Sequence, residues 1–128
     1  MSEQVEQVQK NDLLIRQKCE AMIAYGYTVL RHFPKVERHV LGAEIRTTMW
    51  ALLRLIVVCN KRYYKKTTLQ DLDAEIDLLR SQVRMALNLK YLDFRKYEHW
   101  ARLTDEIGRM VGGWARSIAG DSGGGGAR

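Results

Sequence analysis

Apolar side chains between residues 45 and 59 recur at a spacing that restricts the folds open to this chain. Gaps of four and three residues alternate along one set, Ile45, Met49, Leu52, Ile56 and Cys59. This alternation describes one buried seam of a packed α-helix. A second apolar set lies beside the seam and consists of Trp50, Leu53 and Val57. The pattern predicts the central helix of a small bundle, and the second set is the candidate contact with another subunit.

Three further segments have helical spacing, and the scarcity of proline and of β-branched runs favours helix over sheet. We expect helices over residues 11–32, from a start between 35 and 42 to residue 60, over 68–89, and over 94–119. We expect residues 1–10 to be a frayed segment before the first helix, and the glycine-rich residues 121–128 to form a flexible tail.

Local signals mark the ends of these helices. Pro34 ends the first helix, because a residue before proline is pushed out of α geometry. Thr68 and Asp71 have the spacing of a capping box at the start of the third helix. Asp93 is a candidate N-cap for the fourth. Because short connections make successive helices antiparallel neighbours, we predict an all-α, up-down-up-down four-helix bundle over residues 1–120.

The chain has 128 residues, which suits one domain with its own core. Its first ten residues are polar and unlike a signal peptide, and its longest apolar run, residues 55–59, is too short to cross a bilayer. The two cysteines, Cys19 and Cys59, stand at apolar helical positions and read as reduced core thiols. We therefore expect a cytoplasmic protein without a membrane partner.

No residue pattern indicates catalysis or a bound metal. The three histidines have no cysteine or carboxylate at ligand spacing. Neither a phosphate-binding loop nor a nucleophile elbow is present in the sequence. The glycines between residues 108 and 113 fall inside a helical pattern, so we interpret them as positions of close helix packing. The sequence predicts no enzyme, no cofactor, no metal and no small-molecule substrate.

The net charge of +6 is concentrated in one region, because residues 31–66 hold nine basic and only two acidic side chains. A local basic surface is the usual footprint of a polyanion partner. The candidates are Arg31, Lys35 and Arg38 at the first corner, Arg46 and Arg54 in the second helix, and Lys61, Arg62, Lys65 and Lys66 at the second corner. Since the two corners lie at opposite ends of the second helix, we expect the positive surface to run along the bundle.

Two further features of this surface have alternative interpretations. Arg80 and Arg84 share a face of the third helix, where they either bind phosphate or form ion pairs with Asp77 or another helix. Tyr63 and Tyr64 stand among the lysines of the second corner. They either stack on unpaired bases or close the end of the core with their rings, and we favour closure of the core.

Four segments carry a resemblance to a known family: FPKVERHVLGAEIR (33–46), LLRLI (52–56), LRSQVRMALNLKYL (79–92) and DEIGRMVGGW (105–114). Together they make residues 15–118 resemble the accessory variability determinant (Avd) proteins of diversity-generating retroelements. Related four-helix proteins encoded within rRNA intervening sequences share the first and last segments more loosely. The paired arginines of LRSQVR and the GGW ending favour the retroelement branch.

The resemblance implies a non-catalytic four-helix bundle that assembles into a barrel-shaped homo-oligomer, a pentamer, with a positive surface. Its implied partners are a reverse transcriptase with its template RNA and cDNA, and its implied role is support of mutagenic reverse transcription. Basic residues of the family's third helix contribute to that association, and they match Arg80 and Arg84. The alternatives are an rRNA-associated bundle and a protein-only scaffold whose positive surface meets acidic proteins.

Overall fold

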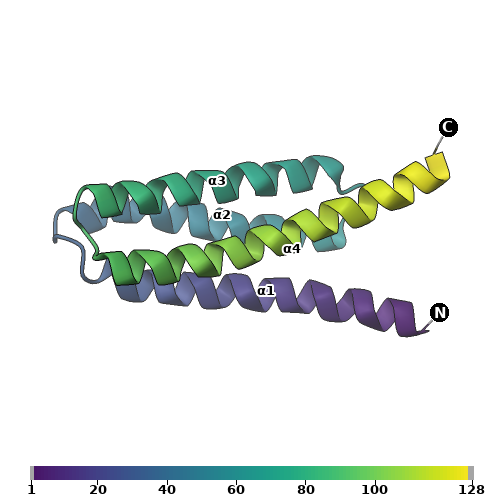
Figure 1. Cartoon of the computed structure of the whole chain (residues 1–128), viewed down its shortest axis with the longest axis horizontal. Helices are drawn as coiled ribbons and strands as arrows, with labels where there is room; N and C mark the ends of the chain where they lie inside the picture. Colours follow the sequence, from purple (N-terminus) through teal and green to yellow (C-terminus); the bar gives the residue numbers. More distant parts are fainter. Residues whose placement is uncertain (1, 127–128) are drawn as a thin grey trace.

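The computed structural model describes residues 2–126, and every element in that range is helical. The elements are α1 (Ser2–Leu30), the 3₁₀ turn η1 (Glu37–His39), α2 (Leu41–Lys61), α3 (Lys66–Asn88) and α4 (Phe94–Gly126). The four α-helices run up-down-up-down, so both ends of the described chain lie at the same end of the bundle as the α2–α3 connection (Figure 1). The predicted four-helix architecture is confirmed.

Each helix packs against its two neighbours around a single core: α1 and α3 both contact α2 and α4. The predicted seam of α2, from Ile45 to Cys59, is completely buried. Burial of each large aliphatic side chain contributes about 1.5–3 kcal/mol, so this seam is a main source of stability. None of the helices in residues 2–126 is long and apolar enough to cross a membrane.

Gly26 lets three helices approach closely. A Cβ atom added there would lie 2.6 Å from Sδ of Met49 on α2 and 2.8 Å from Cζ2 of Trp100 on α4. Both of these side chains are completely buried. The helical cost of glycine, about 1 kcal/mol relative to alanine, is therefore offset by the packing it permits.

Two predicted helix starts are wrong. Helix α1 begins at Ser2 rather than at residue 11. Its first turns contain glutamine, glutamate and lysine, which are good helix formers, and Nε2 of Gln7 donates a hydrogen bond to Oδ1 of Asn11 one turn later (3.1 Å). Helix α3 begins at Lys66, so Thr68 is not its cap. The buried Thr68 hydroxyl instead accepts a hydrogen bond from Nη1 of Arg62 across the corner (3.0 Å).

The α3–α4 turn is built from two capping motifs. Lys90 has a φ of 65°, its N–H donates to the carbonyl of Leu87, and the N–H of Tyr91 donates to the carbonyl of Ala86. These two bonds form a Schellman motif. Asp93 is confirmed as the N-cap of α4: its Oδ1 accepts a hydrogen bond from the backbone N–H of Lys96 (2.8 Å). This hydrogen bond holds the pKa of the Asp93 carboxyl below its usual value.

Helix α4 continues to Gly126, beyond the end predicted near residue 119. No proline interrupts the backbone hydrogen bonding over this last stretch. The flexibility of residues 121–128 and the domain boundary at residue 120 stay predictions.

Candidate nucleic-acid interface

The basic residues of the two corners lie at opposite ends of α2, as the sequence predicts (Figure 1). All of them are exposed except Lys65, which is half-buried. The α1–α2 corner holds Arg31, Lys35 and Arg38, and the α2–α3 corner holds Lys61, Arg62, Lys65 and Lys66. Arg54 is exposed on the outer side of α2 between them. Positive charge therefore follows the length of this helix.

At the α1–α2 corner, two arginines also hold the backbone. Nε of Arg38 donates a hydrogen bond to the carbonyl of Phe33 (3.0 Å). Nη2 of Arg46 donates to the carbonyl of Arg38 (3.0 Å). Neither bond neutralises the guanidinium charge, because both acceptors are uncharged. These two residues brace the corner, whereas Arg31 and Lys35 have no side-chain bond within the described range.

At the α2–α3 corner, Lys65 turns inward. Its Nζ donates hydrogen bonds to the carbonyls of Cys59 and Arg62 and lies 5.9 Å from the ring centroid of Trp114. The positive charge stabilises the carboxyl end of α2, where the last carbonyls lack helical partners. Lys65 therefore has a structural role, while Lys61 and Lys66 show no ion pair among the described side chains.

Arg80 is held between two carboxylates. Its Nη1 lies 2.9 Å from Oδ1 of Asp77 on the same helix, and its Nε lies 3.0 Å from Oδ1 of Asp105 on α4. A Cβ atom at Gly108 would come within 2.7 Å of Nη2 of Arg80, so the guanidinium lies directly over this glycine. Of the two interpretations of Arg80, the structure contains the ion pairs: one with Asp77 and one with a residue of another helix, Asp105.

Arg84 lies one turn further along the same face and is exposed. Within residues 2–126 its side chain forms no ion pair or hydrogen bond. With Arg80, Tyr97 and Thr104 it borders a small hollow of about 150 Å³ between α3 and α4. The two arginines thus share a face, and Arg84 has the charge that is open to a partner.

The residues predicted to contact another subunit, Trp50, Leu53 and Val57, are partly exposed to solvent. The side chain of Trp50 is 46% exposed, and its Nε1 donates a hydrogen bond to the hydroxyl of Tyr27 (2.8 Å). Leu53 and Val57 are half-buried. Contact of these residues with another subunit stays a prediction.

Tyr63 and Tyr64 do not close the core, so that prediction is wrong. Their side chains are 87% and 85% exposed, and the rings form a perpendicular pair with centroids 4.8 Å apart. The physical reason is local: Lys65 occupies the inward position at this corner and binds the end of α2.

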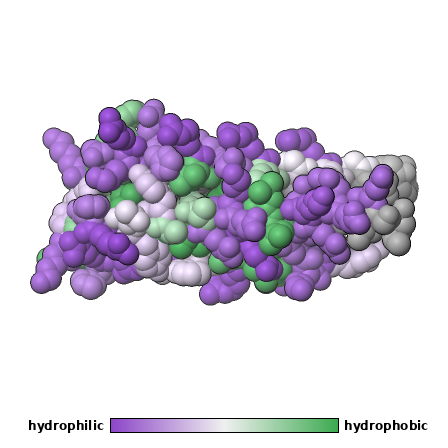
Figure 2. Space-filling model, turned by 90° about the horizontal axis from the view of Figure 1, so that it is seen from below, coloured by the Kyte–Doolittle hydropathy of each residue, from purple (hydrophilic) through white to green (hydrophobic). Residues whose placement is uncertain are grey.

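Apolar side chains also line a flank of α3, beside its buried seam, as the sequence spacing predicts. Leu78, Met85 and Leu89 lie on α3 outside its buried seam and are each about half exposed. Their spacing of seven and four residues was the available signal. On another face, seen from the side of α1, apolar patches are likewise bordered by hydrophilic side chains (Figure 2).

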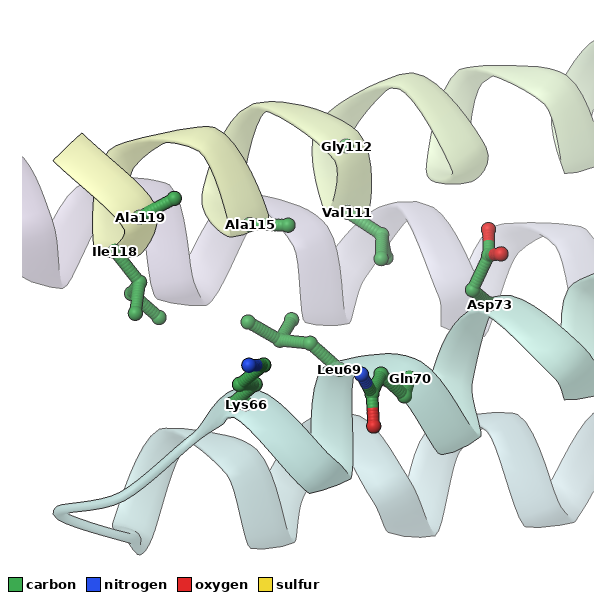
Figure 3. Close-up of a pocket in the computed structure, with 9 residues that line it drawn as sticks. All are labelled: Lys66, Leu69, Gln70, Asp73, Val111, Gly112, Ala115, Ile118 and Ala119. Carbon is green, nitrogen blue, oxygen red and sulfur yellow. The ribbon is translucent and has the colours of Figure 1, made fainter. Parts of the chain in front are cut away.

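An apolar groove of about 600 Å³ between the start of α3 and the end of α4 was missed (Figure 3). Leu69 on α3 faces Val111 and Ile118 on α4, and Lys66 and Asp73 stand at its edge (Figure 3). This groove lies at the end of the bundle where α3 begins and where α4 diverges from α1 (Figure 1). Sequence spacing identifies the seams, but not the distance between them.

Both cysteines are buried and free, as the sequence predicts. Burial raises the pKa of the Cys19 thiol to about 12, and burial likewise raises that of Cys59. Such thiols are protonated at neutral pH and poor nucleophiles. Among the side chains that the structure describes, no three histidine, cysteine or acidic groups lie together so as to hold a metal ion.

Comparison with known proteins gives one family. The sequence model described as bAvd-like matches residues 13–118, which include both basic corners and the arginines of α3. No curated protein matches the chain. The resemblance to Avd proteins that the four sequence segments indicated is thereby confirmed.

Proposed function

Because the chain belongs to the bAvd-like family, we propose that it is a non-catalytic accessory protein of a diversity-generating retroelement. In this proposal a basic homo-oligomer binds the reverse transcriptase together with its template RNA or cDNA and supports mutagenic reverse transcription. The observation that carries the proposal is the exposed positive charge along α2 and on α3, most of it without a carboxylate partner in residues 2–126.

The proposed mechanism is positional. Exposed residues such as Arg84, Arg54 and Lys61 bind phosphate groups, and arginine adds bidentate geometry. This binding releases counterions, so affinity for template RNA falls steeply as salt rises from about 50 to about 200 mM. Fluorescence anisotropy with labelled template RNA measures that slope. An affinity that hardly changes over this range would refute binding through phosphate.

The α3 arginines supply the sharpest test of the partner surface. Replacing Arg80 and Arg84 together by alanine should weaken association with the polymerase or the RNA by about tenfold, while the helical circular-dichroism signal is unchanged. The matched control is Arg102→Ala with Arg109→Ala, because it removes the same charge from two exposed arginines of α4. Arg102 contacts only Glu98 (3.9 Å) and His99 (3.2 Å) among the described side chains. Unchanged association of the double variant would remove Arg80 and Arg84 from the proposed site.

The proposed oligomer uses the apolar stripe of Trp50, Leu53 and Val57. Trp50 supports this assignment because nearly half of a large aromatic side chain is exposed, and tryptophan is enriched at the centres of interfaces. Trp50→Ala should lower the mass in light scattering from that of an assembly towards 14.8 kDa, the mass of one chain. A wild-type protein that is a monomer at micromolar concentration would contradict this assignment.

A protein-only scaffold is the second candidate, and one observation favours it. The exposed guanidinium of Arg84 forms no ion pair among the described side chains, and its planar set of donors fits the carboxylate of an acidic partner as well as it fits phosphate. A partner pulldown that survives nuclease treatment, with no RNA binding by the purified protein, would favour the scaffold. The neighbouring genes distinguish the rRNA-associated alternative from the retroelement protein. A reverse transcriptase gene beside this one would support the retroelement protein, and a location inside an rRNA gene would support the alternative.

A further inference from the structure

The α2–α3 corner carries two exposed tyrosines between basic residues. We propose that this corner is a binding site for unpaired nucleotides, in which Tyr63 and Tyr64 stack on bases while Lys61, Arg62 and Lys66 contact the adjoining phosphates. This inference rests on the proposed function and adds to it the form of nucleic acid that is bound: a single strand rather than a duplex.

The first argument is exposure. Tyr63 and Tyr64 are the most exposed of the large hydrophobic side chains in the described part of the chain. Neither ring packs against the buried core, and neither hydroxyl forms a hydrogen bond within residues 2–126. Folding therefore gains little from these two aromatic groups, although aromatic side chains usually bury a large area.

The second argument is the geometry of the two rings. Their planes are 81° apart and their centroids lie 4.8 Å from each other. In such a perpendicular pair the edge of one ring covers a single face of the other. Each tyrosine therefore keeps at least one face open. Single-strand binding proteins stack successive bases on open aromatic faces of this kind.

The third argument is that the backbone on either side of the pair is fixed. The N–H of Arg62 donates to the carbonyls of Val58 and Cys59, and its Nη1 donates to the Thr68 hydroxyl. Lys65 binds the carbonyls of Cys59 and Arg62. Residues 62 and 65 are thus tied to both helices, so the two tyrosines are presented from a braced turn and lose less freedom when a base binds.

The fourth argument is charge. Lys61 and Lys66 are exposed and have no ion pair among the described side chains, and the guanidinium of Arg62 donates only to a neutral hydroxyl. Three cations therefore border two aromatic rings. Stacking also selects the partner, because base faces inside a duplex are covered by their neighbours and only an unpaired base can present one.

The test uses the full chain and two single-stranded DNA probes of equal length, one with bases and one with abasic spacers throughout. Wild-type protein should bind the strand with bases about tenfold or more tightly than the abasic strand. Tyr63→Ala with Tyr64→Ala should remove this difference, leaving both probes at the affinity of the abasic strand. Tyr63→Phe with Tyr64→Phe should retain it, because phenylalanine keeps the ring.

Controls separate this inference from the proposed function. Phe94→Ala removes another exposed aromatic side chain, 62% exposed, at the opposite end of the bundle, and should leave both affinities unchanged. Lys61→Ala with Lys66→Ala should weaken binding of both probes alike. It should also reduce the salt slope, by about one unit for each phosphate that the variant no longer binds.

The outcomes are distinct. Two results would overturn the stacking site but leave phosphate binding intact. One is equal affinity of the wild-type protein for the two probes, and the other is a double variant, Tyr63→Ala with Tyr64→Ala, that still binds the strand with bases more tightly. Absence of binding to either probe and to template RNA at about 50 mM salt would instead overturn the proposed function. Binding to vesicles of anionic phospholipid that is abolished in the alanine pair, with no change on the strand with bases, would assign the corner to a membrane surface and refute the inference.

Discussion

Nε of Arg80 lies 3.0 Å from Oδ1 of Asp105, a hydrogen-bonded ion pair that joins α3 to α4 above Gly108. The pair is partly exposed: the side chain of Arg80 is 34% exposed and that of Asp105 is 49% exposed. At such exposure an ion pair contributes less than about 1 kcal/mol to stability. The consequence of the pair for binding is larger, because it decides how much of the Arg80 charge a partner meets.

Removing the carboxylates around Arg80 should strengthen binding to nucleic acid. We expect Asp77→Asn combined with Asp105→Asn to raise affinity for template RNA several-fold, with a loss of stability of about 1 kcal/mol or less. Anisotropy and urea unfolding measure the two effects. The control is Glu98→Gln combined with Glu106→Gln, which also removes two negative charges, at α4 positions that pair with Arg102 (3.9 Å) and Lys18 (3.3 Å) outside the proposed surface. An equal gain in both variants would mean that only net charge matters.

Gly26→Ala should destabilise the bundle although alanine is the better helix former. The new Cβ would lie 2.8 Å from the buried ring of Trp100, and overpacking of a core costs about 1–3 kcal/mol. Gly112→Ala is the matched control, because its Cβ would meet only Nη1 of Arg116 at 3.4 Å. It should stabilise α4 by up to about 1 kcal/mol. Chemical denaturation of both variants measures the change in unfolding free energy, which should be negative for Gly26→Ala and positive for Gly112→Ala.

Lys90→Gly should stabilise the α3–α4 turn by about 1 kcal/mol. Lys90 has a φ of 65°, where a side chain is strained and glycine is not. Lys90→Ala removes the same charge but keeps Cβ, so it should bring no such gain. Equal unfolding free energies for the two variants would show that the charge of Lys90, and not its backbone conformation, sets the stability of the turn.

The buried thiols should be unreactive in the folded protein. With a pKa of about 12, Cys19 has almost no thiolate at about pH 8, and a disulfide reagent should modify it only after unfolding. The unfolded thiol titrates near its ordinary value of 9.0, so stability attributed to Cys19 is fully present below that pH and decreases between about pH 9 and 12. Rapid modification of Cys19 by that reagent in the folded protein would contradict its burial.

The apolar pattern of α2 predicted its core face residue by residue, because a helix fixes which positions share a side. Asp93 was equally predictable, since an N-cap acts within three residues of itself. Contacts between distant segments could not be predicted in this way. Asp105 lies 25 residues from Arg80, and the sequence suggested only that some other helix supplies a partner for this arginine.

The tyrosines show a different limit of sequence reasoning. Aromatic rings beside lysines suit both a buried cap and an exposed stacking surface. The choice depended on Lys65, whose ammonium group reaches back to the carbonyls of Cys59 and Arg62. Thr68 illustrates the same competition, because its hydroxyl binds Arg62 rather than the backbone of its own helix. Such choices between local partners are settled by three-dimensional proximity.

The position of the chain ends has a practical consequence for experiments. Both ends of the described chain, at Ser2 and Gly126, lie at the end of the bundle that carries the tyrosine corner (Figure 1). An affinity tag, fluorophore or surface attachment at either terminus would therefore crowd the proposed strand-binding site. A single cysteine introduced at the exposed Lys90, at the far end, offers an attachment point that leaves this corner open, and the native thiols should not compete for the reagent.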